Sequence, residues 1–168
     1  MIKLHPDLPA LPIQPSAWRW LQDYGVELVV RDRHSTRGGG AWWPGRKLVE
    51  LLTVQEEAAI HELAHAWWQE RRLIGTTAAE LMVACVKLSE ETDPRYRRAN
   101  ELANHYVYGL LNQRDDNSPT GWWMGMYVGL GADWEIFAGL ASGVMGDLRL
   151  LPPYVRRFYE GFFDEPAA

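Results

Sequence analysis

The five residues His61-Glu62-Leu63-Ala64-His65 restrict the folds open to this chain more than any other stretch. They lie inside residues 54–72, which Thr53 as an N-cap and Glu56 as its capping-box partner predict to be one helix. Two histidines four residues apart stand on the same helix face, about 40° apart, so both rings can reach one cation. Glu62 directly follows His61, so its carboxylate can sit beside a metal-bound water without being a ligand. The pattern therefore predicts half of a metal site.

The length and composition of the chain suit a single domain. Its 168 residues are enough for one core and few for two, so we treat 1–168 as one domain. A net charge of -5 does not favour nucleic-acid binding, and the only cysteine, Cys85, excludes an intrachain disulfide or a multi-cysteine zinc cluster. The prolines of residues 6–15 break any signal-peptide helix, and no apolar run is long enough to span a membrane. We expect a cytoplasmic protein without nucleic-acid or membrane partners, although non-classical export would leave no trace.

Periodicity and turn residues predict an α+β fold. The prolines indicate an extended N-terminal arm over residues 1–15, followed by a short helix. Strands are expected over 26–31, 40–43 and 47–52, with the turn dipeptide Pro44-Gly45 between the last two. Further helices are predicted over residues 78–90, 93–111 and 134–148 and from Pro153 onward. We therefore expect a small three-stranded antiparallel sheet packed on a mainly helical domain.

A catalytic zinc site normally has three protein ligands, so the third must lie downstream of the two histidines. The candidates are His105, Glu101, Asp133 and Glu135. We favour Glu135 because Gly139, Ser142 and Gly146 follow it on the same helix face. Such small side chains allow a second helix, and hence a short carboxylate, to approach closely. The main alternative is His105, which would make a three-histidine site.

These residues together resemble a known family. A strand, an aromatic edge segment, a second strand, a His-Glu-x-x-His helix and a later Glu-x-Phe-Ala helix are similar to zincin metallopeptidases of the gluzincin type. Tyr127, eight residues before Glu135-Ile136-Phe137-Ala138, makes the chain most similar to the anthrax lethal factor-like peptidase domain. The resemblance covers residues 26–160 and implies a minimal zincin-like fold. The chain departs from the family at Gly139, where a second acid often helps to orient the metal ligands.

The resemblance implies a zinc site and a mechanism. Zn²⁺ would be held by His61, His65 and Glu135, the family's third ligand, with Glu62 as the general base. Tyr127 would donate to the oxyanion, with Tyr154 as a lesser candidate.

It also implies a substrate-binding strand. Residues 39–43 correspond to the zincin edge strand, which pairs with the substrate backbone. Its residues Gly40, Ala41, Trp42 and Trp43 alternate across the strand, so one tryptophan could line a substrate pocket while the other packs inward.

We therefore expect a zinc-dependent endopeptidase acting on protein or peptide substrates. One alternative is a regulatory protease that cleaves a repressor, although no DNA-binding or sensor segment is recognisable. Another is a non-catalytic zincin-like binding module that zinc only stabilises. Glu62 argues against the binding module, because a structural site needs no carboxylate at the base position. Oligomeric state cannot be read from the chain.

Overall fold

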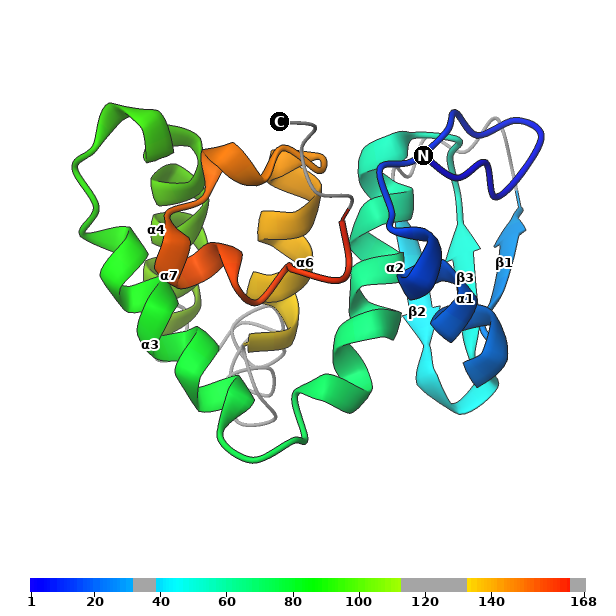
Figure 1. Ribbon diagram of the computed structural model, residues 1–168, viewed down its shortest axis with the longest axis horizontal. Coiled ribbons are helices and arrows are strands. Elements are labelled where there is room, and N and C mark those ends of the chain that lie inside the picture. The colour runs from blue at the N-terminus through cyan, green and yellow to red at the C-terminus, as the bar shows by residue number, and fades with distance from the viewer. Residues whose placement is uncertain (32–38, 113–132, 164–168) are drawn as a thin grey trace.

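The computed structural model describes residues 1–31, 39–112 and 133–163, without the side chains of 107–112. Helices and a small three-stranded sheet confirm the predicted α+β class (Figure 1). The helices are α1 (Pro15–Tyr24), α2 (Glu56–Arg71), α3 (Thr77–Ser89), α4 (Arg97–Asn112), α6 (Asp133–Val144) and α7 (Pro153–Arg156). Single 3₁₀ turns occur at Pro44–Arg46, Pro94–Tyr96 and Leu148–Leu150.

The sheet contains β1 (Glu27–Val30), β2 (Gly40–Trp43) and β3 (Leu48–Leu51) in the order β1-β3-β2. β2 pairs antiparallel with β3, but β1 pairs parallel with β3, so the prediction of an antiparallel sheet was wrong. The chain reverses direction between β1 and β2 and again between β2 and β3. β1 and β3 therefore run the same way, and their pairing makes the sheet mixed. The apolar β3 takes the centre, where Val49 and Leu51 are fully buried, and β2 is left at an edge.

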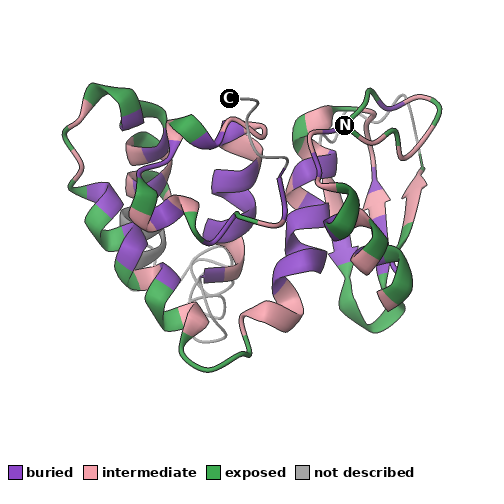
Figure 2. Ribbon diagram, in the orientation of Figure 1, coloured by how far each residue is buried: buried purple, intermediate pink, exposed green. Residues whose placement is uncertain are grey.

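α2 lies between the sheet and the other long helices (Figure 1). From Ala59 to Trp68 almost every residue of this helix is buried (Figure 2). A helix that is apolar on nearly all sides is expected in the interior of a protein rather than on its surface. The histidines and the glutamate of α2 are therefore held inside the fold by the apolar residues around them.

A stack of aromatic rings fixes α6 against α2. Trp68 of α2 stacks on Phe137 of α6, with centroids 4.4 Å apart and planes 9° apart. Phe137 stacks on Tyr159 at 4.4 Å and 3°, and the Tyr159 hydroxyl donates to the Phe137 carbonyl at 3.0 Å. Such ring pairs contribute about 0.5–1.5 kcal/mol each beyond the area they bury. The stack therefore joins the two helices that carry the predicted metal ligands.

The glycines of α6 face α4. A Cβ on Gly139 would overlap the ring of Tyr106, and one on Gly143 would overlap Leu102. We expected the small residues after Glu135 to admit the helix that carries the histidines. That explanation was wrong for the two glycines it named, because Gly139 meets Tyr106 of α4 and Gly146 meets Pro12 and Phe163.

Two predicted features of the N-terminal half differ in the structure. The N-terminal segment is not an extended arm: it folds back through a bridge between Ile2 and Leu11, and Leu8 and Leu11 are buried. Burial of these apolar side chains accounts for the fold-back. α2 begins at Glu56 rather than Val54, because residues 52–55 form the turn from β3, and the Thr53 hydroxyl caps nothing.

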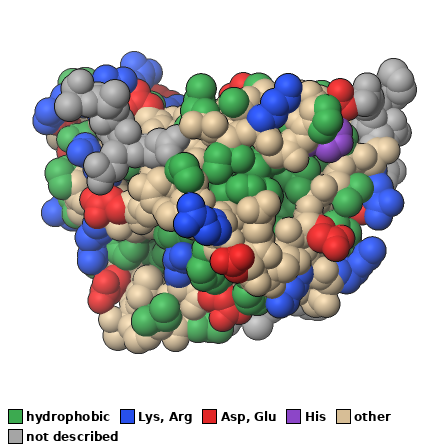
Figure 3. Space-filling view, turned by 45° about the vertical axis from the view of Figure 1, so that its right-hand side comes forward, with side chains coloured by type: hydrophobic (Ala, Val, Ile, Leu, Met, Phe, Trp, Pro, Cys, Tyr) green, Lys and Arg blue, Asp and Glu red, His purple; other side chains and the backbone are tan. Residues whose placement is uncertain are grey.

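Helix length and surface charge show whether the described residues have features that suit a membrane or a strongly charged partner. None of the described helices combines the length and the apolar character that crossing a membrane requires. On the face shown in Figure 3, acidic and basic side chains of the described residues are interspersed.

We expect Gly139→Ala to lower the free energy of unfolding by about 1–3 kcal/mol, since the added methyl must displace the Tyr106 ring. Chemical denaturation would measure the change. Gly45→Ala is the matched control, because no atom lies within 4 Å of its added Cβ, and it should change stability by less than about 0.5 kcal/mol. The penalty should shrink when Tyr106 is also replaced by alanine. Equal penalties with and without Tyr106 would contradict this packing.

Candidate metal centre

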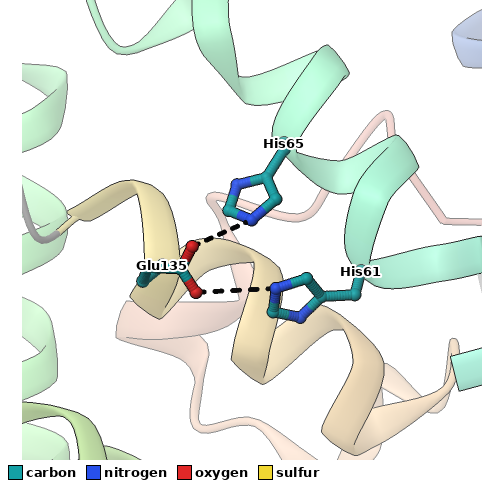
Figure 4. A group of neighbouring side chains, drawn as sticks. All are labelled: His61, His65 and Glu135. Atoms are coloured by element: carbon teal, nitrogen blue, oxygen red, sulfur yellow. Dashed lines mark ion pairs between the residues drawn. The ribbon is translucent and has the colours of Figure 1, made fainter. Parts of the chain in front are cut away.

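Three side chains that are distant in the sequence meet between α2 and α6. The Nε2 atom of His65 lies 3.1 Å from one oxygen of Glu135, and the Nε2 atom of His61 lies 3.5 Å from the other. Figure 4 shows the two rings and the carboxylate pointing toward one another. One ligand atom from each residue lies within 4.8 Å of the other two. Of the four candidates for third ligand, Glu135 is thus the one that the fold brings to both histidines.

The donor set fits a divalent cation. Ligand atoms in a tetrahedral zinc site lie about 3.3 Å apart, as follows from bond lengths of about 2.0–2.2 Å. The two nitrogen–oxygen distances in the cluster, 3.1 and 3.5 Å, are close to that value but end on different oxygens of Glu135. Two imidazoles and one carboxylate also leave a fourth position open, as catalytic zinc sites do. His61, His65 and Glu135 therefore supply donors of the kind and number that such an ion requires.

The three groups stabilise one another as an ion-pair cluster. Burial by itself would raise the pKa of Glu135, but hydrogen bonds and charge from the two histidines hold that pKa far below its usual value. Burial would lower the pKa of His61, yet the hydrogen bond and charge of Glu135 outweigh burial and raise it. A depressed carboxyl pKa stabilises the fold above about pH 4.5, and a raised histidine pKa stabilises it below about pH 6.5. The ion pairs of the cluster therefore contribute most to stability between these two pH values.

The chain has Gly139 where the resemblance led us to look for a second acid. The carbonyl of Ala138, the residue before it, hydrogen-bonds the His61 ring. Among the described residues, the buried Nδ1 of His65 has no hydrogen-bond partner. Partners of this kind fix the orientation of a metal-ligating imidazole.

Glu62 lines a cavity next to the three possible ligands but is not one of them. It is 7% exposed, and burial raises the pKa of its carboxyl, although the two nearby histidines oppose that rise. The backbone amide of Trp42 donates a hydrogen bond to the Glu62 carboxylate. A buried carboxylate with a raised pKa beside a set of metal ligands is typical of a functional group rather than of a solvated surface residue.

The cavity at the cluster has a volume of about 260 Å³. It is lined by residues of α2, of the first turn of α6 and of the edge strand β2: Gly40, Ala41, Trp42, His61, Glu62, His65, Trp134 and Glu135. Three of the four predicted edge-strand residues thus reach it. Trp42 is also held by a hydrogen bond from its ring nitrogen to Gln69 at 2.7 Å, whereas Trp43 is 45% exposed and does not line the cavity.

Gly40 permits β2 to lie close to Glu62. A Cβ at this position would be 2.6 Å from the Glu50 carbonyl oxygen and 3.0 Å from Cγ of Glu62. Any larger residue would push β2 away from the cavity or displace the carboxylate. The sequence pattern assigned Gly40 to a strand but gave no sign of this close approach.

The remaining candidates lie elsewhere or are otherwise engaged. His105 is exposed on α4, beside the ring of Tyr106, and Glu101 is exposed and pairs with Arg97. Asp133 is buried in an ion pair with Arg72. The hydroxyl of Tyr154 donates to Glu91 at 2.9 Å and does not line the cavity.

Two further residues, Tyr127 and Trp134, concern the match between the predicted and the observed site. Tyr127 falls in residues 113–132, outside the described part of the chain. Trp134 lines the cavity and meets the His65 ring edge to face at 5.5 Å, which our reading of the sequence missed. Its position next to Glu135 was the available signal, but adjacent helix residues usually point to different faces.

Comparisons with known proteins do not identify a family for this chain: no family model matches it, and searches of curated proteins and of solved structures find no similar protein. The resemblance to zincin metallopeptidases therefore depends on the sequence motif alone.

We expect Glu135→Ala to weaken Zn²⁺ binding by more than about 100-fold, which exceeds the usual cost of losing only an orienting partner. His105→Ala should leave the affinity unchanged, since His105 is exposed on α4. Competition with a chromophoric chelator would measure both variants. Loss of binding in His105→Ala but not in Glu135→Ala would replace Glu135 as the third ligand.

The affinity for Zn²⁺ should rise with pH above about 6.5 and level off once His61 has lost its proton, because its raised pKa makes the ion compete with that proton. Chelator competition between about pH 5.5 and about pH 8.5 would show the rise. Glu135→Gln removes the charge that raises the pKa, so its weaker affinity should level off at lower pH. An affinity that levels off at the same pH in both proteins would contradict the coupling.

Proposed function

We propose that this protein is a zinc-dependent metallopeptidase that hydrolyses peptide bonds in protein or peptide substrates. The observation that supports this most is that Glu62 shares one cavity with His61, His65 and Glu135, beside the edge strand β2. A structural metal site is normally closed by four protein ligands and has no use for a buried carboxylate next to it.

The ion would be held by His61, His65 and Glu135, the three residues whose ligand atoms converge. When bound, zinc in such a site lowers the pKa of a water molecule and polarises the carbonyl under attack. Zinc is favoured over magnesium or calcium because two of the three donors are imidazole nitrogens, whereas those cations prefer oxygen ligands.

Glu62 is suited to the work of a general base. Its raised pKa brings the carboxylate nearer to neutral pH, where a group can both accept and return a proton. In the proposed reaction the Glu62 carboxylate takes a proton from the attacking water. It then delivers that proton to the nitrogen of the leaving amine as the peptide bond breaks.

β2 offers the substrate a strand to pair with. Within the described residues it pairs with β3 on one side only, and its residues Gly40, Ala41 and Trp42 line the cavity. An extended peptide can add to such an edge through backbone hydrogen bonds, which would hold its carbonyl near Glu62. The preferred substrate is therefore a protein segment or peptide that can adopt an extended conformation.

The donor to the oxyanion is proposed from the sequence alone. Tyr127 remains our prediction for this role, by the resemblance to lethal factor-like peptidases. The hydroxyl of Tyr154 is bonded to Glu91, so Tyr154 is a weaker candidate.

We expect Glu62→Gln to lower peptide hydrolysis by about 100-fold or more, since general-base catalysis contributes roughly 10²–10⁴. Zn²⁺ affinity should change little, because Glu62 is not a ligand in the proposed site. Cleavage of quenched-fluorescent peptides of mixed sequence would be followed beside chelator competition. The matched control is Glu57→Gln, the same chemical change at an exposed position of α2.

Two results would overturn the proposal. Unchanged cleavage in Glu62→Gln would remove the mechanism. Tight Zn²⁺ binding with no cleavage of any peptide in the mixture would favour a zinc-stabilised binding module instead.

A further inference from the structure

Asp133 is a buried carboxylate that the proposed chemistry does not use. It is 1% exposed and accepts one hydrogen bond from α2 and two from Arg72, the residue that follows the end of α2. The ring nitrogen of Trp68 donates to its Oδ2 at 2.8 Å. Nε and Nη2 of Arg72 donate to Oδ2 and Oδ1 at 3.0 and 3.1 Å. We refer to Asp133, Trp68 and Arg72 together as the Asp133 clamp.

The clamp joins the same two helices as the ligand cluster. On α2, Trp68 follows His65 by three residues, which is about one helical turn. On α6, Asp133 precedes Glu135 by two residues, so the two carboxylates leave the helix in different directions. Each meets a separate part of α2.

Glu135 belongs to the first turn of α6, and helix ends fray unless something fixes them. Two contacts of Trp68 enclose this turn. Its ring nitrogen binds Asp133 before Glu135, and its ring face stacks on Phe137 after it. The backbone of Glu135 is thus held on both sides against the helix that carries the histidines.

The chemistry of the clamp favours a fixed geometry. A bidentate arginine–carboxylate pair sets an angle as well as a distance, because both groups are planar. Burying such a pair contributes little to net stability, and its best-attested use is to fix register between elements. An ion pair between Glu135 and the histidines tolerates small shifts, whereas bonds to a metal must fit within about 0.2 Å.

We propose that Asp133 is a positioning residue for the metal centre. Through Arg72 and Trp68 it holds the first turn of α6 in the place where Glu135 can bind the same ion as His61 and His65. This inference rests on the proposed function, since it assigns Asp133 a role only if those three residues bind a metal.

The test compares Asp133→Asn with the native protein in Co²⁺ and Zn²⁺ binding. The asparagine keeps the size of the side chain and an oxygen for Trp68, but it loses the bidentate charged pair with Arg72. We expect the affinity for both ions to fall by about 10–100-fold, as is usual when a group that orients a ligand is lost. The visible absorption of bound Co²⁺ should also change, because the position of Glu135 alters the coordination geometry.

Tyr159→Phe is the matched control for loss of stability alone. It removes a buried hydrogen bond to the same helix, at the Phe137 carbonyl, but leaves the clamp intact. Its thermal unfolding temperature should fall while Co²⁺ affinity and spectrum stay native. If Tyr159→Phe loses affinity as Asp133→Asn does, the effect is general destabilisation and the inference fails.

Other outcomes separate the two proposals. Native affinity and spectrum in Asp133→Asn would overturn the positioning role and leave the proposed function standing. Absence of Co²⁺ and Zn²⁺ binding in the native protein would overturn the proposed function and the inference together.

If Asp133→Asn does not fold, the variant Trp68→Phe provides the test. It keeps a ring to stack on Phe137 but loses the hydrogen-bond donor to Asp133. Weaker binding with an altered Co²⁺ spectrum supports the clamp, and native behaviour contradicts it.

Discussion

The contact between α2 and α6 is the constraint on which the rest of the structure depends. It brings Glu135 to two histidines that lie seventy or more positions earlier in the chain, and it does so inside the core. Shape alone would not set the meeting point, because apolar helix faces can slide past one another at small cost. The stack of Trp68 on Phe137 and the buried pair of Asp133 with Arg72 remove that freedom on either side of Glu135.

Packing a polar cluster between these helices has an energetic cost that the cluster itself largely offsets. Buried carboxylates and imidazoles lose hydration, which is tolerable only when each group finds a partner. Glu135 and His61 shift one another's pKa in the directions that favour the charged pair, so the metal-free site is held together electrostatically. His65 is the less satisfied member, since its buried Nδ1 has no hydrogen-bond partner within the part of the chain that the structure describes. The same attraction that stabilises the metal-free cluster makes a cation compete with the proton on His61.

The mixed sheet contributes by leaving β2 at an edge beside the cavity. Because β3 takes the centre, the β2–β3 hairpin presents its outer strand to Glu62. Gly40 makes this closeness possible, and the Trp42 amide supplies a hydrogen bond to the carboxylate. A sheet with β2 in the centre would lose this arrangement, because both edges of the strand would then be paired. The order of three short strands thus matters as much to the proposed substrate path as any single side chain.

The sequence alone determined the local features of this protein. Residue spacing on one helix already put His61 and His65 on a common face, and the strands around Pro44–Arg46 followed from alternation and turn residues. Short-range pattern carries such information because it depends on neighbours within one or two turns. Only the tertiary structure decided which distant carboxylate meets the histidines, that β1 runs parallel to β3, and that Gly139 faces Tyr106 of α4. Asp133 and Glu135 are equally acidic in the sequence. Their different roles come from the face of α6 each occupies and from what α2 places opposite it, which no local pattern encodes.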